Sequence, residues 1–224
     1  MALSDKRILT EMKGGDIIIH PFRRANLGTS SYDLTLGEWF YREQPYAKYH
    51  HKIYNIYNQK DTEYVWGKKP FRAERAKIVF QRYKFNWVGI KPSDKVIVLE
   101  PGETILAHTN EFIGGRNHIT TMMKARSSFG RVFISVCKCA GWGDVGYTNR
   151  WTMEISNNSS HYTIPLVVGR RIAQMIFFDT GEIAGADYTK TGKYNKTTDL
   201  KKLKRDWQPT MMLPRLWADR DIGQ

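Results

Sequence analysis

Short strand-like segments separated by turn residues constrain the fold of this chain most strongly. They recur along the chain and are broken by Gly, Pro, Asn and Asp, while long stretches with helical periodicity are scarce. Closely spaced short strands with frequent turns are typical of an all-β barrel or sandwich. We therefore predict a mainly all-β fold, with strands at residues 16–20, 27–37, 96–99, 104–107, 118–123, 132–138, 150–156, 163–168 and 171–178.

The N-terminus is expected to differ, because it carries the signals of a short helix. Ser4 or Asp5 can cap that helix, Ile8 and Leu9 supply an apolar face, and the glycine pair at 14–15 ends it.

Residues 41–91 and 180–224 also depart from the strand pattern. The first segment is crowded with Tyr, Lys, Arg and His, and we interpret it as a surface excursion with short strands and one helix near residues 71–80. Adjacent residues on a strand point to opposite faces, so His50 and His51 are expected to be solvated or partly packed rather than metal ligands. The second segment is expected to form a polar C-terminal tail.

Charge and cysteine content narrow the class of protein. The 224 residues carry a formal net charge of +13, which draws a protein towards nucleotides, nucleic acid or anionic membrane surfaces without choosing among them. Cys137 and Cys139 are too few for a disulfide framework, and no apolar run approaches the length of a membrane helix. We expect a protein of the reducing cytoplasm that is not inserted in a membrane.

Four polar residues surround Gly130 near the end of a predicted strand: Arg126, Ser127, Ser128 and Arg131. Hydroxyl groups, backbone amides and guanidinium groups are what a polyphosphate requires. The same pattern also fits a helix N-terminus capped by Ser with exposed arginines, and the residues alone leave both interpretations open.

Two carboxylates follow within thirty residues, at Asp144 and Glu154. Asp144 lies in a glycine-rich hairpin, where it either accepts a sugar hydroxyl beside an aromatic ring or closes an ordinary Asx turn. In the strand at 150–156, alternation places Thr152 and Glu154 on the face opposite Met153 and Ile155. Glu154 therefore faces either solvent or a pocket, and in a pocket it would need a partner such as Arg131.

The order of these elements resembles the dCTP deaminase branch of the trimeric dUTPase superfamily. Residues 3–8, 17–21 and 30–37 are similar to the opening of the family, and residues 98–103 to its middle hairpin. Its site motifs are matched by Arg126-Ser-Ser-x-x-Arg131, Ala140-Gly-Trp-x-Asp-x-Gly-Tyr147, Thr152-x-Glu154 and Arg171-Ile-Ala-Gln174. Glu154 stands ten positions after Asp144, where the dUTPases have an apolar residue, and the chain lacks their Gly-Gly-Phe-Gly-Ser-type tail. Both differences favour the deaminases.

The resemblance implies one domain over residues 1–224 with a distorted, jelly-roll-like β-barrel, a short N-terminal helix and a few peripheral helices. It also implies a homotrimer with active sites at the subunit interfaces, in which one subunit supplies the serine and arginine segment to the pocket of another. No zinc is implied, and the Cys137-Lys-Cys139 pattern does not match the metal site of the zinc deaminases. A magnesium ion bound through the nucleotide phosphates is expected instead.

The resemblance also assigns roles to individual residues. Glu154 would act as general base towards a water that adds to C4 of cytosine, with Arg131 and Ser127 positioning the reacting groups. The remaining predicted binding residues would contact the base, the deoxyribose and the phosphates; they are Arg126, Ser128, Ala140, Asp144, Tyr147, Gln174, Tyr188 and Lys193.

Two departures from the family pattern affect these expectations. Gly143 replaces the usual branched apolar residue before the hairpin Asp, which is expected to loosen the turn. Lys193-Tyr194 is present, but residues 195–199 lack the Gln and Gly of the segment that closes over the triphosphate.

Three functions follow from the sequence. The leading expectation is zinc-independent deamination of dCTP to dUTP and ammonia. The alternative is a bifunctional enzyme that also cleaves the triphosphate to dUMP and pyrophosphate. The third is a non-catalytic regulator on the same scaffold that binds nucleotides or, through basic segments such as residues 201–205, nucleic acid.

Overall fold

The fold is built mainly of antiparallel strands, as the sequence predicts. The computed structural model describes residues 1–45 and 52–219, so the prediction for His50 and His51 lies outside the described residues. The strands are β1 (Ile17–His20), β2 (Tyr32–Arg42), β3 (Phe71–Arg72), β4 (Glu74–Arg75), β5 (Lys95–Leu99), β6 (Thr104–Gly115), β7 (Ile119–Ala125), β8 (Ile134–Ser135), β9 (Trp142–Gly143), β10 (Thr148–Asn157), β11 (Ile164–Val167) and β12 (Arg171–Asp179). The helices are α1 (Asp5–Gly14), α2 (Gln59–Trp66), α3 (Ala76–Tyr83), α4 (Ser127–Arg131), α5 (Tyr188–Thr191) and α6 (Leu200–Asp206).

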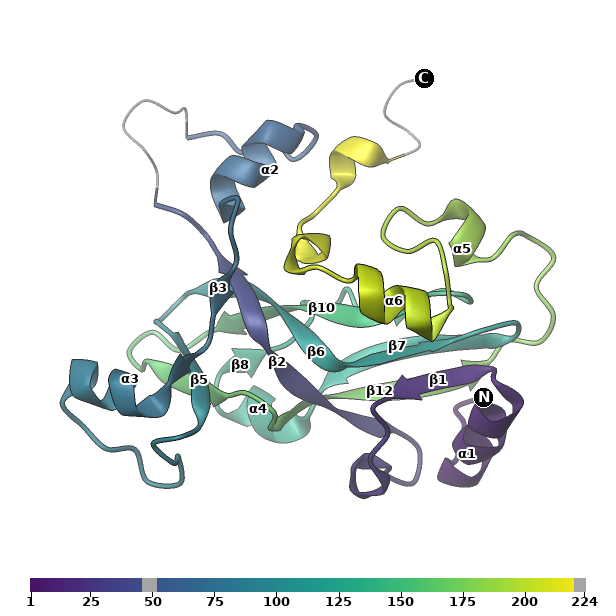
Figure 1. Ribbon diagram of the computed structural model, residues 1–224, viewed down its shortest axis with the longest axis horizontal. Coiled ribbons are helices and arrows are strands. Elements are labelled where there is room, and N and C mark those ends of the chain that lie inside the picture. The colour runs from purple at the N-terminus through teal and green to yellow at the C-terminus, as the bar shows by residue number, and fades with distance from the viewer. Residues whose placement is uncertain (46–51, 220–224) are drawn as a thin grey trace.

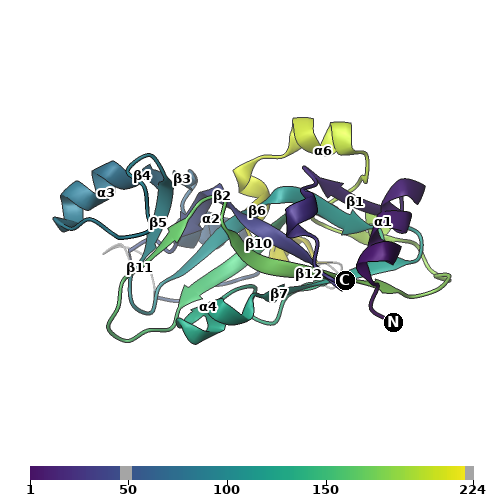
Figure 2. The ribbon, with the colours of Figure 1, turned by 90° about the horizontal axis from the view of Figure 1, so that it is seen from below.

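A curled nine-stranded sheet forms the body of the molecule. Its main path runs in the order β8-β10-β6-β2-β12-β7-β9, with β1 added on β6 and β3 added on β2. A second, three-stranded sheet, β11-β5-β4, lies at the end of the molecule that also holds α3, and α1 lies at the opposite end (Figure 1). Seen from below, α6 and α4 lie on opposite sides of the main sheet (Figure 2).

The predicted N-terminal helix is confirmed as α1. The hydroxyl of its N-cap residue Ser4 accepts a hydrogen bond from the backbone N–H of Arg7 at 3.4 Å. Gly15 ends the helix with φ of 87°, a left-handed conformation that glycine adopts without strain. Ile8 is fully buried in the main core and fixes the helix to the sheet.

The hairpin that the resemblance implies at residues 98–103 is wrong in its pairing. Both strands exist and Glu103 donates its N–H to the carbonyl of Glu100 across the turn between them. However, β5 pairs with β11 and β4, whereas β6 pairs with β2, β10 and β1. The turn therefore carries the chain from one sheet to the other, and β6 continues to Gly115, well beyond the predicted end.

The strand predicted at residues 132–138 is also mostly wrong. Only the short β8 forms there, because Phe133, Cys137 and Lys138 have positive φ angles of 66°, 61° and 32°, which no regular strand tolerates. Likewise, the glycine-rich segment at 140–147 is a turn and not a paired hairpin, since β9 pairs with β7 while β10 pairs with β6 and β8.

The excursion is more helical than predicted. The helix expected at residues 71–80 begins at Ala76, because β3 and β4 occupy the residues before it. Helix α2, which starts after the N-cap residue Asn58 and ends before Gly67, was not predicted from the sequence. The helices within residues 1–45 and 52–219 are all too short or too polar to span a bilayer.

Alternation along β10 is confirmed. Met153 and Ile155 are fully buried and belong to the main core, while Thr152 and Glu154 line a cavity on the other face of the strand. The register of β10 against β6 places Glu154 opposite Leu106 and Thr152 opposite His108. This face of β10 is the floor of the candidate site.

Candidate active site

A cavity of about 470 Å³ lies over β10 and is walled by aromatic side chains from three parts of the chain. Trp66 comes from α2, Trp142 and Tyr147 flank the turn before β10, and Trp207 follows α6. Five of the predicted site residues line this cavity: Ala140, Asp144, Tyr147, Glu154 and Tyr188. Its size and its mixture of aromatic walls with a few polar groups are typical of small-molecule sites.

Glu154 is the chemically unusual group of this cavity. Its Oε2 atom is buried and has no hydrogen-bond partner within the described residues. Burial raises the pKa of the Glu154 carboxyl above its usual range, and the positive charge of Lys138 lowers it by less. A carboxylate with a raised pKa and a free oxygen is suited to taking a proton from water near neutral pH.

Asp144 and Tyr147 lie at the turn that precedes β10. Asp144 is exposed and accepts a hydrogen bond from the indole N–H of Trp142 at 3.1 Å. Tyr147 lies edge-on to Trp151 and to Tyr188, with ring centroids 5.0 Å away in each case. The turn therefore presents a carboxylate oxygen next to an aromatic surface, which is the arrangement that a sugar ring with a free hydroxyl requires.

Gly143 is required by the packing of this turn. A Cβ atom at this position would lie 2.4 Å from the ring of Trp151 and 2.6 Å from the hydroxyl of Thr121. Trp151 is buried and donates its indole N–H to the carbonyl of Ile113 at 2.9 Å. The expectation that Gly143 loosens the turn is thus wrong: Trp151 occupies the space in which a larger side chain would lie.

A second cavity adjoins the first and shares Asp144 and Tyr188 with it. This cavity adds the ammonium groups of Lys193 and Lys196. Lys193 forms an ion pair with Asp219 at 2.7 Å and lies over the ring of Tyr194. A ligand bound at Asp144 can therefore extend towards a cationic groove.

Three of the predicted phosphate-binding residues lie together but away from both cavities. Arg126 lies 3.5 Å from Asp33, the residue that also pairs with Arg171 at 3.0 Å. Gln174 donates to the hydroxyl of Ser31 at 3.3 Å. Ser128 is exposed on α4.

Arg131 and Ser127 are not brought to Glu154 within one chain. Both are exposed on α4, which lies on the opposite side of the sheet from α6 (Figure 2), whereas Glu154 shares its cavity with residues that follow α6. The Ser127 side chain does not cap α4, whose N-cap is Arg126 with no side-chain cap bond. The predicted Arg131–Glu154 pair is therefore absent from the described part of a single subunit.

The cationic end of the cavity floor was not predicted from the sequence. Arg150 lies between the rings of Phe112 and Trp207, with its guanidinium carbon 5.1 Å and 4.7 Å from their centroids. Its Nε atom is buried without a hydrogen-bond partner among the described residues. Alternation with Thr152 and Glu154 along β10 was the available signal, but only the structure shows that Trp207 reaches it.

The tail is anchored rather than loose. Asn195 is buried and donates to the carbonyl of Thr148 at 3.1 Å, and Arg116 donates to the hydroxyl of Thr198 at 2.8 Å. Asp199 then caps α6. Residues 195–199 therefore contact the body of the protein.

The two cysteines are free thiols in different environments. Cys137 is buried and Cys139 is exposed. Burial raises the pKa of the Cys137 thiol to about 11, so this residue is protonated at neutral pH.

Comparison with known proteins identifies the relatives of this chain. A family model described as dCTP deaminase-like matches residues 2–180. A dUMP-forming dCTP deaminase of Methanococcus vannielii is 32% identical over 209 residues, covering 89% of this chain and 93% of the relative. A protein of the same name from a Hydrogenobaculum species is 31% identical over 183 residues, covering 82% and 85%.

A solved structure supports the same fold. The crystal structure of a 2′-deoxycytidine 5′-triphosphate deaminase from Agrobacterium tumefaciens superimposes with a TM-score of 0.52 at 18% identity, over 79% of this chain and 47% of that one. The chain thus spans about half of the length of that protein. The family model and the sequence relatives together show that this chain belongs to the dCTP deaminase-like family of enzymes.

Proposed function

We propose that this protein is a bifunctional enzyme that deaminates dCTP and hydrolyses the resulting triphosphate to dUMP and pyrophosphate. The observation that carries the proposal is the buried, unpartnered Glu154 carboxylate in a cavity that also holds Asp144 and Tyr147. The relatives named dUMP-forming favour this alternative over dUTP as the final product.

The deamination step follows from the free oxygen of Glu154. That oxygen takes a proton from a water molecule whose oxygen adds to C4 of cytosine, and the protonated Glu154 delivers this proton to N3 of the ring. Glu154 then takes the proton of the new C4 hydroxyl and passes it to the amino group; the bond between C4 and the amino nitrogen breaks, and ammonia leaves a carbonyl at C4. Asp144 accepts the 3′-hydroxyl, Tyr147 packs on the deoxyribose, and Ala140 lies beside the base.

Arg131 and Ser127 complete the site from a neighbouring subunit. In this proposal the protein is a homotrimer, and α4 of one subunit enters the cavity of the next. The positive charge of Arg131 then pairs with Glu154 and stabilises the negative charge that develops at the ring. Two observations support this exchange. The Glu154 carboxylate has an oxygen without a partner among the described residues, and the Arg131 guanidinium is exposed on the other side of the same chain.

The phosphates are held by cationic and neutral donors. A neighbouring subunit supplies Arg126 and Ser128 at α4 and Gln174 on β12. The tail supplies Tyr188 and Lys193. None of these side chains carries an anionic oxygen, so a magnesium ion would be held by the phosphate oxygens rather than by the protein. When bound, it would neutralise the charge of the triphosphate.

Incubation with dCTP and magnesium tests both reactions when dUTP, dUMP, pyrophosphate and ammonia are resolved. We expect ammonia, dUMP and pyrophosphate in equal amounts. Accumulation of dUTP without pyrophosphate would restrict the enzyme to deamination, and retention of dCTP without any product would leave only a binding function.

Glu154→Gln supplies the matched test of mechanism. The amide keeps the shape of the side chain but cannot accept the proton, so the rate of ammonia release should fall by at least a factor of about 10³, while dCTP still binds in a calorimetric titration. Glu182→Gln, an exposed residue outside the cavity, is the control and should keep the parent rate. Ammonia release by Glu154→Gln near the parent rate would refute the assignment.

A further inference from the structure

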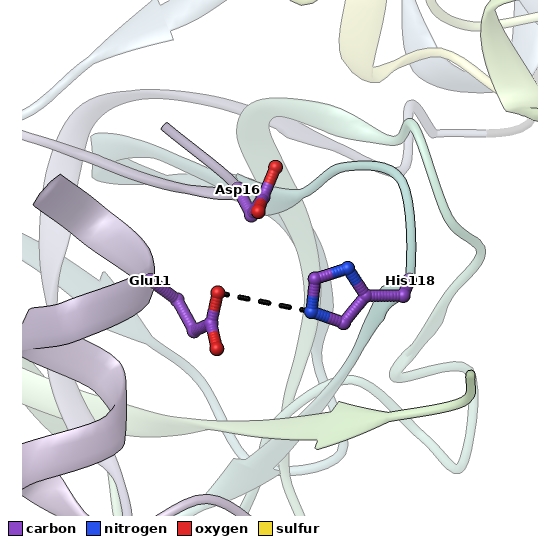
Figure 3. A group of neighbouring side chains, drawn as sticks. All are labelled: Glu11, Asp16 and His118. Carbon is purple, nitrogen blue, oxygen red and sulfur yellow. Dashed lines mark ion pairs between the residues drawn. The ribbon is translucent and has the colours of Figure 1, made fainter. Parts of the chain in front are cut away.

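Three metal-ligating side chains meet at the N-terminal end of the molecule, outside the cavity described above. Glu11 lies on α1, Asp16 follows the end of α1, and His118 lies in the turn between β6 and β7 (Figure 3). One potential ligand atom of each residue lies within 4.8 Å of the other two. Segments that are about a hundred residues apart in the sequence thus present one nitrogen and two carboxylates to the same point.

The spacing of these atoms suits a shared ion better than a hydrogen bond. Glu11 Oε2 lies 3.7 Å from His118 Nε2, which is longer than any hydrogen bond between such atoms. Two ligands bound tetrahedrally to one ion, at bond lengths of about 2.1 Å, are separated by roughly 3.5 Å. Glu11 and His118 therefore stand close to the required separation.

One oxygen of each carboxylate is already held in place. Arg7 binds Glu11 Oε1 at 2.6 Å, and the side-chain amide of Asn117 donates to Asp16 Oδ1 at 2.5 Å. Outer hydrogen bonds of this kind orient the ligands of metal sites and fix which oxygen faces the ion. Glu11 is only 8% exposed, so its inward-facing oxygen has little access to bulk water.

The local charge also favours a bound cation. The Arg7 guanidinium, which pairs with Glu11 at 2.6 Å, is shared with Asp179 at 3.6 Å, so it offsets only part of the charge of the two carboxylates in the cluster. A divalent cation would compensate the excess negative charge at this point, where Glu11 is largely removed from solvent.

We propose that Glu11, Asp16 and His118 bind a divalent transition-metal ion, with Zn²⁺ as the expected ion, and that this ion clamps α1 to the turn between β6 and β7. An imidazole with carboxylates is a ligand set that suits Zn²⁺. Binding requires Asp16 to move towards the other two ligands, and water completes the coordination. The clamp is separate from deamination, because none of the three residues lines the active-site cavity.

The test measures metal binding and thermal stability, so that its outcome does not depend on enzymatic activity. Chelator-treated protein is titrated with Zn²⁺, with Mg²⁺ in parallel, by calorimetry and by thermal unfolding. All proteins carry Cys139→Ser, because this exposed thiol is a competing zinc ligand. The variants are His118→Gln and Asp16→Asn, and His161→Gln, a histidine outside the cluster, is the control.

We expect Zn²⁺ to bind the parent protein and the control with one-to-one stoichiometry and to raise their Tm by several degrees, with no effect of Mg²⁺. Each cluster variant should bind at least tenfold more weakly and lose the Tm shift, while its circular dichroism spectrum stays that of the parent. Equal Zn²⁺ affinity in the parent and both cluster variants, or no binding by the parent protein, would overturn the proposal and leave only the direct contact between Glu11 and His118.

Discussion

Burial shifts the pKa of individual side chains in this protein, among them His108. His108 is 1% exposed, its Nδ1 atom donates to the carbonyl of Thr109 at 2.8 Å, and its Nε2 atom accepts from the backbone N–H of Trp39 at 3.3 Å. Burial lowers the pKa of the His108 imidazole to about 4, so the ring stays neutral well below the pH at which an exposed histidine gains a proton. Its ring also fills the space beside Gly37, where a Cβ atom would lie 2.0 Å away.

This histidine should make the protein acid-sensitive. Because the unfolded imidazole binds its proton near pH 6.5 and the folded one only near pH 4, the free energy of unfolding should fall as the pH drops through this window. The loss attributable to His108 should reach roughly 3 kcal/mol at pH 4.

Urea unfolding of the parent and His108→Gln at pH 7 and pH 4.5 measures this effect. The amide can replace both hydrogen bonds but has no proton to gain, so the variant should lose less stability on acidification. Glu111 and Glu154, whose raised pKa values favour folding at low pH, oppose the trend equally in both proteins. An identical decrease in both proteins would contradict the prediction.

Gly143→Val tests the packing of the turn before Asp144. The added side chain would meet the Trp151 ring and Thr121, and overpacking of this kind should lower the free energy of unfolding by roughly 2–3 kcal/mol. Denaturant unfolding measures the loss. Gly130→Ala is the control, since a Cβ atom there meets nothing within 4 Å, and a stable Gly143→Val protein would show that the turn is free to move.

At the scale of elements, the tail determines the shape of the cavity. Trp207 follows α6 and lies against both Arg150 and His108, with its ring 4.6 Å from that of His108. Met212 then packs on Tyr41 and Leu106 in a small core of its own. The tail is thus a fixed wall over β10, and its position depends on a few aromatic and apolar contacts.

Trp207→Ala should release this wall. Removal of the ring deletes a cation–π contact and apolar packing, so we expect a loss of roughly 2 kcal/mol in stability and a several-fold higher KM for dCTP. Thermal unfolding and steady-state kinetics check both expectations. Trp217→Ala, on the same tail but outside this cavity, should leave KM unchanged; equal effects of the two substitutions would contradict the role of Trp207.

The elements that sequence predicts well are those with a local signal. The Ser4 cap and the glycines after it define α1, and the alternation around Met153 defines β10 and the direction of Glu154. Strand pairing depends on residues that are distant in the sequence. The turn at 100–103 looks like the turn of a hairpin, but the strands on either side of it belong to different sheets. The β-branched residues at 132–136 favour a strand, but the turns around Phe133 and Cys137 override that preference.

At the scale of the whole molecule, the candidate site is divided. The cavity with Glu154, Asp144 and Tyr147 belongs to one face of the sheet, while Arg131 and Ser127 lie on α4 on the other (Figure 2). The local patterns of the sequence do not show this separation, since the motifs lie within fifty residues of one another along the chain; only the family resemblance implied it.

We also propose that residues 1–224 form one domain, since β2 connects the excursion to the main sheet through β3.

Complementation between subunits tests this division. Glu154→Gln and Arg131→Ala should each be inactive alone, but co-expressed chains that assemble at random should recover about a quarter of the parent activity, the fraction of sites built from one intact half of each. Product assays on the purified mixture measure the recovery. A mixture as inactive as either variant would show that each chain uses its own Arg131.

The position of α4 opposite the cavity also has a consequence for mixed populations of normal and defective chains. If each site draws on two chains, a chain defective only in α4 spoils a single neighbouring site, and activity falls in proportion to the fraction of such chains. A chain with defects in both the Glu154 cavity and α4 inactivates its own site and one site of a neighbouring chain. Activity is then proportional to the square of the fraction of normal chains. A defective gene copy of the second kind would therefore be partly dominant, although its product folds and assembles normally.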